Sequence, residues 1–368
     1  MMDERDFAYL DMAEALAVRS LGFTSPNPHV GAVVVRGGRI VGTGHHEAAG
    51  QPHAEIIALR RAGKRARGAT LYLTLEPCVH WGRTPPCAES VLRSGIARVV
   101  AAGLDPNPAI HGRGAQLLRK AGIVVDVGSR VERKSGLNEA HAKYIVHKRP
   151  FVTLKAALSI DGKLATRTGE ARWISSPEAR DYAHFLRSEN DAVLVGVNTI
   201  LNDDPRLTVR PPGRPGKPIL RVILDPNLRT PPGAQIFSNP EDGSVLLYTG
   251  SGSRTWKIRR AGLLRRGAEV VEVPGHGPLL DLRRILSDLG RREIAGLLVE
   301  GGGRTATGFI EARLVDKAVF AVAPLLIGGT DAVSLFAGRG TSRLAAAPRL
   351  SRVSTFRLGG DLLMEGYF

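Results

Sequence analysis

Short apolar strands that alternate with helical segments are the feature that most restricts the fold of this chain. In its first part, apolar runs typical of strands occupy residues 31–36, 39–42, 70–74, 98–102 and 123–127. Apolar residues recur at helical spacing in residues 3–20 and in the run that follows Pro52 up to Leu59. Gly37-Gly38 between the first two strands is typical of a tight hairpin. This alternation predicts an α/β domain.

A second alternating pattern begins near Tyr144-Ile-Val-His-Lys-Arg-Pro150. Strands are predicted at residues 151–158, 192–197, 219–224, 245–248, 270–273, 295–299 and 317–323. Helices are predicted at residues 279–289 and at residues 176–187, where Ser176 can cap the helix and Pro177 can take its first position. The Pro- and Gly-rich residues 211–218 predict a surface loop. Since a domain takes roughly 150 residues, we expect the 368 residues to form two domains, 1–147 and 148–368.

The composition restricts the class of protein. Hydrophobic residues make up 43% and charged residues 23% of the chain, which is typical of a globular protein. No apolar run approaches the roughly 20 residues that span a bilayer, and the acidic start Met1-Met2-Asp3-Glu4 lacks the apolar core of a signal peptide. Two cysteines, Cys78 and Cys87, are too few for a disulfide framework. We therefore expect a cytoplasmic protein without a membrane partner.

A formal net charge of +16 raises the question of nucleic-acid binding. The excess is spread along the chain, with 19 basic and 13 acidic side chains in residues 1–147 and 32 and 22 in the remainder. Most of the basic residues are arginines in an Ala- and Gly-rich chain, which favours a general composition bias. Scattered arginines serve a small phosphate-bearing molecule equally well, so we expect a small-molecule partner and no nucleic acid.

Four residues of the first domain form the pattern of a catalytic zinc site. His53 and Glu55 open a predicted helix, Cys78 follows a strand, and Cys87 starts the next helix. One histidine and two cysteines leave the fourth position of zinc open to water, whereas structural zinc normally has four protein ligands. The metal lowers the pKa of that water, and Glu55 can pass its proton to a leaving amine. This pattern is typical of zinc deaminases that act on nucleobases.

Other interpretations remain for these four residues. Taken singly, each cysteine can be a small buried hydrophobe and His53 a core histidine. A nucleic-acid-editing deaminase would share the zinc pattern, but predicts a clustered basic face and a short Cys-x-x-Cys loop. Tight oligonucleotide binding at moderate salt would favour it. A non-enzymatic zinc-stabilised binding module has no use for Glu55; zinc that cannot be removed without unfolding, together with no turnover, would favour it.

A glycine-rich loop marks a candidate site in the second domain. Gly296-Leu-Leu-Val-Glu300 leads into Gly301-Gly-Gly-Arg-Thr-Ala-Thr-Gly308 and then into an apolar helical run. A glycine turn between a strand and a helix offers backbone N–H groups to a phosphate, assisted by the helix dipole. The loop lacks the glycine spacing of a Rossmann fingerprint. By itself, it is equally consistent with a tight turn.

The loop between the two cysteines carries a resemblance to a known family. Its form, Leu75-Glu-Pro-Cys-Val-His-Trp-Gly-Arg-Thr-Pro-Pro-Cys87, resembles that of the bifunctional riboflavin-biosynthesis deaminase/reductases. Val79 stands where that family usually has Ser. Further matching pieces, in the same order, are Pro26-Asn-Pro28, Gly44-His-His46, Asp105-Pro-Asn-Pro108 and Gly112-Arg-Gly114. Residues 151–162, 173–175, 196–199, 202–210 and 299–302 look like the reductase half, and the match is weak between about 211 and 290.

The resemblance implies an α/β chain with an N-terminal cytidine-deaminase-like, three-layer domain and a C-terminal dihydrofolate-reductase-like domain. It implies Zn²⁺ and NADPH as cofactors and a homo-oligomer. The implied reactions are a zinc-hydroxide deamination of 2,5-diamino-6-(5-phosphoribosylamino)pyrimidin-4(3H)-one by residues 1–147, and then reduction of the ribosyl group to ribityl by residues 148–368.

By matching position, the resemblance also assigns residues. The zinc ligands would be His53, Cys78 and Cys87, with Glu55 catalytic, and Asn27 and His46 would contact the pyrimidine. The cofactor would meet Ala157, Trp173, Thr199, Asp203, Pro226, Gly302, Gly303, Arg304, Thr305, Ala306, Thr307 and Gly308. The sugar phosphate would meet Ala171, Arg187, Leu207, Arg210 and Glu300. Lys155 and Asp161 are candidates to polarise or protonate the reacting sugar, whereas His45, His80 and His111 receive no role.

Overall fold

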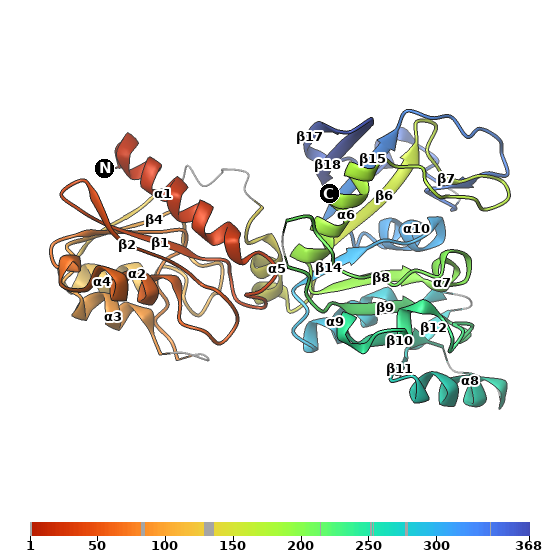
Figure 1. Ribbon diagram of the computed structural model, residues 1–368, viewed down its shortest axis with the longest axis horizontal. Helices are drawn as coiled ribbons and strands as arrows, with labels where there is room; N and C mark the ends of the chain where they lie inside the picture. The colour runs from red at the N-terminus through yellow and green to blue at the C-terminus, as the bar shows by residue number, and fades with distance from the viewer. Residues whose placement is uncertain are drawn as a thin grey trace. The chain divides into compact units, whose positions relative to one another are not determined.

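The computed structural model describes residues 2–81, 85–128, 136–213, 215–250, 252, 254–276, 279–338 and 340–368. It consists of two compact units, Met1–Lys148 and Arg149–Phe368 (Figure 1). Residues 82–84 of the loop between the cysteines, and residue 214 of the predicted surface loop, lie outside the described residues. Within the described part of the chain, no helix has both the length and the apolar character needed to cross a bilayer.

The first unit contains one mixed five-stranded sheet in the order β2-β1-β3-β4-β5. Strand β1 is antiparallel to both of its neighbours, and β3, β4 and β5 are parallel. The strands are β1 (Gly31–Arg36), β2 (Arg39–His45), β3 (Thr70–Leu73), β4 (Arg98–Ala101) and β5 (Val124–Val127). The helices are α1 (Glu4–Ala17), α2 (Ala54–Ala62), α3 (Cys87–Arg93), α4 (Arg113–Lys120) and α5 (Glu139–His147).

Helices cover both faces of this sheet, because alternate residues of a strand point to opposite sides. Val33 of β1 belongs to a buried cluster with Leu10 of α1. Its neighbour Val34 belongs to the cluster on the other face, with Ala58 of α2 and Leu118 of α4. Figure 1 shows α1 on one side of the sheet and α2, α3 and α4 on the other. The predicted three-layer architecture is confirmed.

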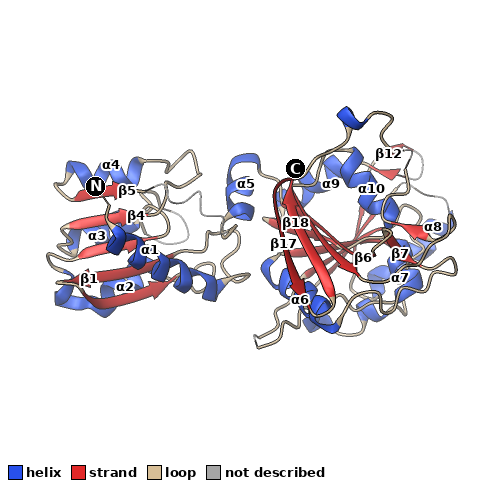
Figure 2. Cartoon of the chain, turned by 90° about the horizontal axis from the view of Figure 1, so that it is seen from above, coloured by secondary structure: helices blue, strands red, loops and turns tan. Residues whose placement is uncertain are grey.

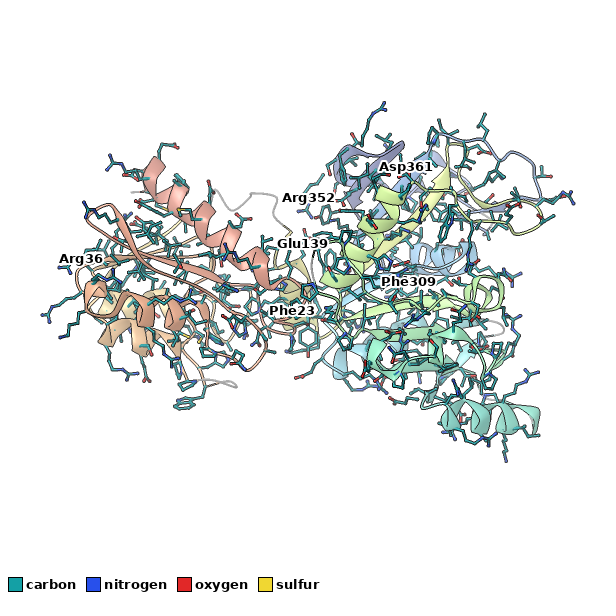
Figure 3. All side chains as sticks on the ribbon, in the orientation of Figure 1. Phe23, Arg36, Glu139, Phe309, Arg352 and Asp361 are labelled. Atoms are coloured by element: carbon teal, nitrogen blue, oxygen red, sulfur yellow. The ribbon has the colours of Figure 1, made fainter. Side chains whose placement is uncertain are left out.

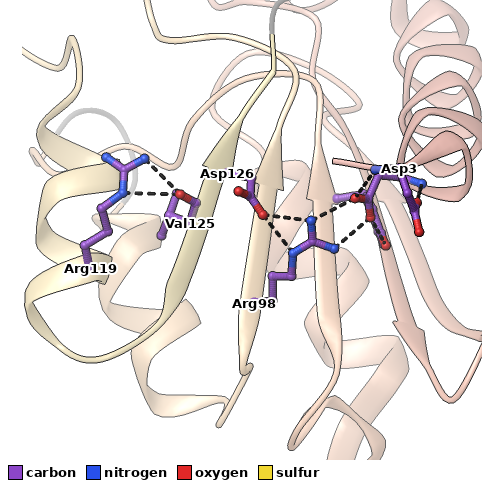
Figure 4. A network of polar contacts seen from close by, with 7 residues as sticks. Asp3, Arg98, Arg119, Val125 and Asp126 are labelled. Atoms are coloured by element: carbon purple, nitrogen blue, oxygen red, sulfur yellow. Dashed lines mark hydrogen bonds and ion pairs between the residues drawn. The ribbon is translucent and has the colours of Figure 1, made fainter. Parts of the chain in front are cut away.

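An ion-pair network joins α1 to the sheet (Figure 4). The Arg98 guanidinium, at the start of β4, donates to both carboxylate oxygens of Asp6 at 2.8 Å and to Asp126 at 2.7 and 2.9 Å. The Tyr72 hydroxyl donates to Asp6 at 2.8 Å. Although burial opposes the shift, these donors hold the pKa of Asp6 below its usual value. The network therefore fixes the first helix against β3, β4 and β5.

The second unit contains a nine-stranded sheet in the order β11-β10-β9-β8-β14-β6-β15-β18-β17. The strands from β11 to β15 are parallel, and β18 and β17 are antiparallel additions. These strands are β6 (Phe151–Ser159), β8 (Ala192–Gly196), β9 (Leu220–Leu224), β10 (Val245–Thr249), β11 (Glu269–Glu272), β14 (Gly296–Val299), β15 (Lys317–Ala323), β17 (Ser351–Leu358) and β18 (Asp361–Tyr367). Two short pairs are β7 (Lys163–Ala165) with β16 (Val333–Ser334), and β12 (Gly275–His276) with β13 (Leu279–Leu280).

Helices also cover both faces of the larger sheet, which is why its parallel strands are continuous apolar runs. The helices are α6 (Pro177–Glu189), α7 (Val197–Asp203), α8 (Arg254–Arg265), α9 (Leu282–Arg291) and α10 (Gly303–Glu311). Phe309 of α10, labelled in Figure 3, is fully buried in one cluster with Leu297 of β14. Leu186 of α6 packs with Leu298 of β14, on the opposite face. Ser176 caps α6 and Pro177 begins it, as predicted.

Several segments differ from the sequence predictions. The helix predicted at 279–289 begins later, because Leu279–Leu280 form β13 and Asp281 caps α9 by accepting the N–H groups of Arg283 and Arg284. Strands β17 and β18, paired beside the C-terminus in Figure 2, were not predicted. Seven of the eight side chains of β17 are exposed, so the sequence shows no alternation of buried and exposed positions there. Helices α5, α7 and α8 were also not predicted.

Candidate active sites

The three predicted metal ligands converge in the first unit. His53 directly precedes α2, Cys87 is the first residue of α3, and Cys78 lies in the loop after β3. His53 Nδ1 lies 3.1 Å from Cys87 Sγ and 3.7 Å from Cys78 Sγ, and the three ligand atoms lie within 4.8 Å of one another. One imidazole nitrogen and two sulfurs suit tetrahedral zinc with one position left for water. The residues present therefore fit the metal.

A hydrogen bond between the two cysteine side chains shifts their pKa values in opposite directions. A hydrogen bond from the Cys87 thiol, assisted by His53, lowers the pKa of Cys78 to about 4. The same hydrogen bond raises the pKa of Cys87, because this thiol is the donor. The thiolate is the form of cysteine that binds metals. Cys78 is thus prepared as a ligand, and metal binding would displace the proton of Cys87.

Glu55 places a carboxylate beside the ligands without being one of them. It lies in the first turn of α2, it is 4% exposed, and its Oε2 atom has no hydrogen-bond partner among the described residues. Burial raises the pKa of this carboxyl, and the nearby His53 opposes the shift. A buried carboxylate oxygen without a partner is costly, so its presence indicates that a bound group completes it. A water at the metal would do so.

A cavity of about 170 Å³ opens onto this site. It contains both predicted pyrimidine contacts, Asn27 and His46. His46 Nδ1 lies 3.2 Å from the Pro52 carbonyl, to which it donates, and His46 Nε2 lies 3.2 Å from Asn27 Nδ2. The Asn27 amide therefore donates to the imidazole and keeps its oxygen for another donor.

Several residues of this cavity received no role from the sequence. They include Glu76, His80, Asp105, Asn107, Ile110 and His141. Glu76 precedes Pro77 and Cys78, and its oxygens accept the backbone N–H groups of Asp105, Gly112 and Ala115 at 3.0, 2.6 and 3.2 Å. A Cβ at Gly114 would collide with the carbonyl of Pro77, which explains the glycine there. These residues belong to the sequence motifs at 75–78, 105–108 and 112–114. The motifs marked the positions, but they could not predict the hydrogen bonds that Glu76 makes. His45 and His111 do not line the cavity.

A second cavity, of about 680 Å³, lies in the second unit. Most of the residues predicted for the reductase line it: Lys155, Ala157, Ala171, Trp173, Arg187, Thr199, Asp203, Leu207, Arg210, Glu300 and Gly302. Pro226, Asp161 and residues 303–308 are not among its lining residues. The Asp161 carboxylate instead accepts the N–H groups of Ile327 and Gly328 at 3.1 and 2.8 Å. Asp161 is therefore a contact of the loop after β15.

Arg187 and Glu300 form a two-pronged ion pair in this cavity. Arg187 Nε and Nη2 donate to the Glu300 carboxylate at 2.7 and 2.8 Å, and Nη1 donates to the Thr208 carbonyl at 3.0 Å. Burial opposes the charge of Glu300, but Arg187 holds the pKa of this carboxyl below its usual value. Two of the five guanidinium N–H groups remain for a further acceptor.

Burial lowers the pKa of the Lys155 ammonium, which makes this group a better proton donor, and Glu300 opposes that shift. A further feature of the cavity suits an anionic ligand. Helix α10 begins at Gly303, and no side chain caps its first turn. A Cβ built on Gly302 would meet no atom within 4 Å, so there is open space beside this helix start. Uncapped N–H groups and open space fit a phosphate of a dinucleotide cofactor.

Comparison with known proteins agrees with this geometry. Residues 3–103 match the cytidine and deoxycytidylate deaminase zinc-binding region, and residues 150–364 match the RibD C-terminal domain. The chain is 48% identical over 328 residues to riboflavin biosynthesis protein RibD of Aquifex aeolicus, covering 89% of each protein. It is 38% identical over 373 residues to RibD of Escherichia coli, covering 98% of this chain and 99% of the relative.

Solved structures give the same result. RibD of Acinetobacter baumannii superposes with a TM-score of 0.87 at 34% identity, over 99% of both chains. A diaminohydroxyphosphoribosylaminopyrimidine deaminase/5-amino-6-(5-phosphoribosylamino)uracil reductase of Thermotoga maritima superposes with a TM-score of 0.84 at 34% identity, over 98% of both chains. The resemblance, the fold class and the cofactors Zn²⁺ and NADPH are confirmed. The chain thus belongs to the RibD family and is a bifunctional deaminase and reductase of riboflavin biosynthesis.

Proposed function

We propose that residues 1–147 convert 2,5-diamino-6-(5-phosphoribosylamino)pyrimidin-4(3H)-one and water into 5-amino-6-(5-phosphoribosylamino)uracil and ammonia, and that residues 148–368 reduce the ribosyl group of this product to ribityl. The observation that carries the proposal is the metal-ligand triad within 4.8 Å beside the partnerless Glu55 oxygen. The substrate is a small molecule rather than a nucleic acid, which the small volume of the cavity, about 170 Å³, supports.

In the deaminase, each role follows from the chemistry of the side chain. His53, Cys78 and Cys87 hold zinc, which when bound supplies a water of lowered pKa. Glu55 accepts a proton from that water through its free oxygen and returns it to the departing amino group. Asn27 and His46 hold the pyrimidine ring in the cavity that they line.

In the reductase, NADPH when bound supplies the hydride. We place the cofactor against Ala157, Trp173, Thr199, Asp203, Pro226 and residues 302–308. The exposed ring of Trp173, with the Arg180 guanidinium 4.5 Å from its centroid, offers an aromatic surface next to a positive charge.

The sugar phosphate lies against the cationic side of the same cavity. We assign Ala171, Arg187, Leu207, Arg210 and Glu300 to it. Leu207 has a φ of +53°, a backbone conformation that non-glycine residues rarely adopt, and its side chain is buried, so its backbone is the part available to a ligand. Lys155 is the better placed of the two candidate proton donors, because Asp161 is engaged by the loop after β15.

We further propose a cytoplasmic homo-oligomer. Both cysteines are free thiols, which suits a reducing compartment. Light scattering of the purified protein tests the oligomeric state; a monomer at micromolar concentration would overturn that part of the proposal.

Mass spectrometry of the products tests the function directly. Zinc-loaded protein is incubated with the diaminopyrimidine ribosyl phosphate, with and without NADPH. Deaminated product alone in the absence of NADPH, and a further reduced product in its presence, are expected. Deamination without any NADPH-dependent step would overturn the reductase assignment. No turnover under either condition would overturn the deaminase assignment, and the reductase is then tested with supplied 5-amino-6-(5-phosphoribosylamino)uracil.

A further inference from the structure

One polar atom in the deaminase cavity has no part in the chemistry described above. His141, on α5, is 8% exposed, and its Nδ1 lies 2.9 Å from the Pro26 carbonyl oxygen. A carbonyl oxygen only accepts, so Nδ1 carries the proton of this hydrogen bond and Nε2 of the neutral ring carries a lone pair. Among the described residues, Nε2 has no hydrogen-bond partner. Glu139, labelled in Figure 3, marks the first turn of this helix.

A second acceptor faces this nitrogen. Asp105 Oδ1 lies 3.9 Å from His141 Nε2, and both residues line the cavity. The position of Asp105 is fixed, because its side chain accepts the Asn107 N–H at 2.8 Å, its backbone N–H donates to Glu76, and its carbonyl accepts from His111. A separation of 3.9 Å is too long for a direct hydrogen bond. Two buried acceptors across such a gap leave room for a donor from a third group.

We propose that His141 Nε2 and Asp105 Oδ1 together bind an N–H or O–H donor of the deaminase substrate, away from the amino group that reacts. The inference rests on the proposed function, whose substrate carries several such donors: a second amino group, a ribosylamino N–H and ribose hydroxyls. His141 is thereby a specificity-determining residue, because a ligand without the donor leaves the buried Nε2 of His141 unpaired.

A purely structural role for His141 makes a different prediction. Its hydrogen bond to the carbonyl of Pro26, 115 positions earlier in the chain, connects α5 to the turn that carries Asn27. In that role only the Nδ1–H group matters. The two ring nitrogens therefore distinguish the two roles, and two substitutions separate them.

The test compares H141N with H141Q. The Asn amide nitrogen takes the place of Nδ1 and keeps the bond to Pro26, but nothing replaces the Nε2 acceptor. The longer Gln side chain reaches the Nε2 position with an amide oxygen and gives up the bond to Pro26. Steady-state deamination, zinc content and Tm are measured for each variant. His147→Asn, an exposed position on the same helix, is the matched control.

We expect H141N to raise KM for the diaminopyrimidine roughly ten- to hundredfold, the loss that follows from an unpaired buried group, with wild-type zinc content and Tm. H141Q recovers most of that KM while its Tm falls. Wild-type KM in H141N, or impairment in H141Q alone, would overturn the proposal. Absence of turnover in the wild-type protein would instead be a failure of the proposed function.

A second variant keeps the test valid if either His141 substitution unfolds the first unit. Asp105→Ala removes the acceptor on the other side of the gap and leaves His141 in place. We expect D105A to raise KM as H141N does. A wild-type KM in D105A would also overturn the proposal.

Discussion

At the scale of single residues, Glu76 organises the wall of the deaminase cavity. It is 4% exposed, and its carboxylate accepts three backbone N–H groups from the loop after β4 and the start of α4. Because Glu76 lies two positions before Cys78, these bonds connect a metal ligand to Asp105. Glu76 is therefore a positioning residue for both the metal and the substrate.

Replacing Glu76 with Gln tests this role. The Gln amide turns one acceptor into a donor that faces backbone N–H groups, so we expect the first unit to lose about 1–3 kcal/mol of stability, together with weaker zinc binding and a higher KM for deamination. Zinc titration with a competing chelator and thermal unfolding measure the two effects. Glu89→Gln on the surface of α3, where Glu89 pairs with the exposed Arg93, is the control. Wild-type zinc affinity in E76Q would contradict the role.

Arg187 controls the ionisation of Glu300 in the reductase cavity. Removing the guanidinium by Arg187→Gln leaves a buried carboxyl whose burial is opposed only by the weaker effects of Lys155 and His184, so the pKa of Glu300 rises. The ionised Glu300 carboxylate is the form that is paired in the structure. As the pH is lowered, the variant should therefore lose reductase activity at a higher pH than the wild type does. The pH profile of kcat/KM for reduction measures the shift. An acid limb identical to that of the wild type, or the same shift in the surface variant Arg284→Gln, would refute the explanation.

The sequence could identify some of these residues and not others. The positions of His53, Cys78, Cys87 and Glu55 relative to predicted helix starts were enough to predict a zinc site, and the three ligands converge in the structure. Nothing in the local sequence predicts that His141 meets Pro26, because the contact depends on how α5 packs. The buried pairing of Arg187 with Glu300 spans 113 positions and is likewise set by the fold.

At the scale of elements, the Arg98 network fixes α1 to three strands. Asp6 lies in the first turn of α1 and receives both prongs of the guanidinium. Removing one partner of a buried ion pair typically costs about 3–5 kcal/mol, and here Asp126 retains part of the pairing. The stability of the first unit therefore depends on the charge of one helix residue.

Asp6→Asn should destabilise the first unit at pH 7 by about 2–4 kcal/mol, somewhat less than a complete loss of partner. The pKa of Asp6 is depressed in the folded protein, so its contribution is present above the unfolded pKa, which is about 3.9 for Asp, and is lost as the pH falls below it. The difference in the free energy of unfolding between wild type and D6N should therefore be constant from pH 7 to about 5 and should become smaller below 4.

Urea-dependent hydrogen exchange of peptides from β3 and β4, read by mass spectrometry, measures this gap within the first unit. Asp11→Asn, on an exposed position of the same helix, is the control for the loss of a charge from α1. A gap that persists unchanged at low pH would show that packing, and not the charge of Asp6, is responsible.

Elements were predictable where their burial left a pattern in the sequence. The central parallel strands are buried on both faces, so each is a short apolar run that the sequence shows. Strand β17 is an edge strand that is exposed along nearly its whole length, and its pairing with β18 defines it. The helix predicted from residue 279 begins at Leu282, because Asp281 caps it and Leu279–Leu280 pair with β12.

At the scale of the whole molecule, the chain carries two sites, each built within one unit. The zinc ligands, Glu55 and the deaminase cavity belong to the first unit, and the larger cavity with Arg187 and Glu300 belongs to the second. The family and the two kinds of domain were predictable because motifs of both halves occur in order along the chain. The roles of Ala157 and Ala171, which line the reductase cavity, were assigned only by resemblance, because an alanine side chain offers no chemistry of its own.

If each unit carries its own reaction, one substitution should abolish one reaction and leave the other. Glu55→Gln removes the proton acceptor and keeps the three metal ligands, so we expect deamination to fall by about 10²–10⁴-fold, the usual contribution of a general base, with zinc content unchanged. Reduction of supplied 5-amino-6-(5-phosphoribosylamino)uracil by the same variant should proceed at the wild-type rate, because Glu55 lies outside the unit that contains the reductase cavity.

A mixture of two variants tests whether the two sites act separately. At a pH below the acid limb of R187Q and above that of the wild type, R187Q should deaminate normally and reduce poorly. Neither variant alone then yields the ribityl product from the diaminopyrimidine at an appreciable rate, whereas an equal mixture of E55Q and R187Q yields it through the released uracil intermediate. Mass spectrometry of the three reactions with NADPH measures this. Product from E55Q alone at the wild-type rate would remove Glu55 from the deamination mechanism. Loss of uracil reduction in E55Q, with its zinc intact, would mean that the two reactions depend on each other in a way that two separate sites do not explain.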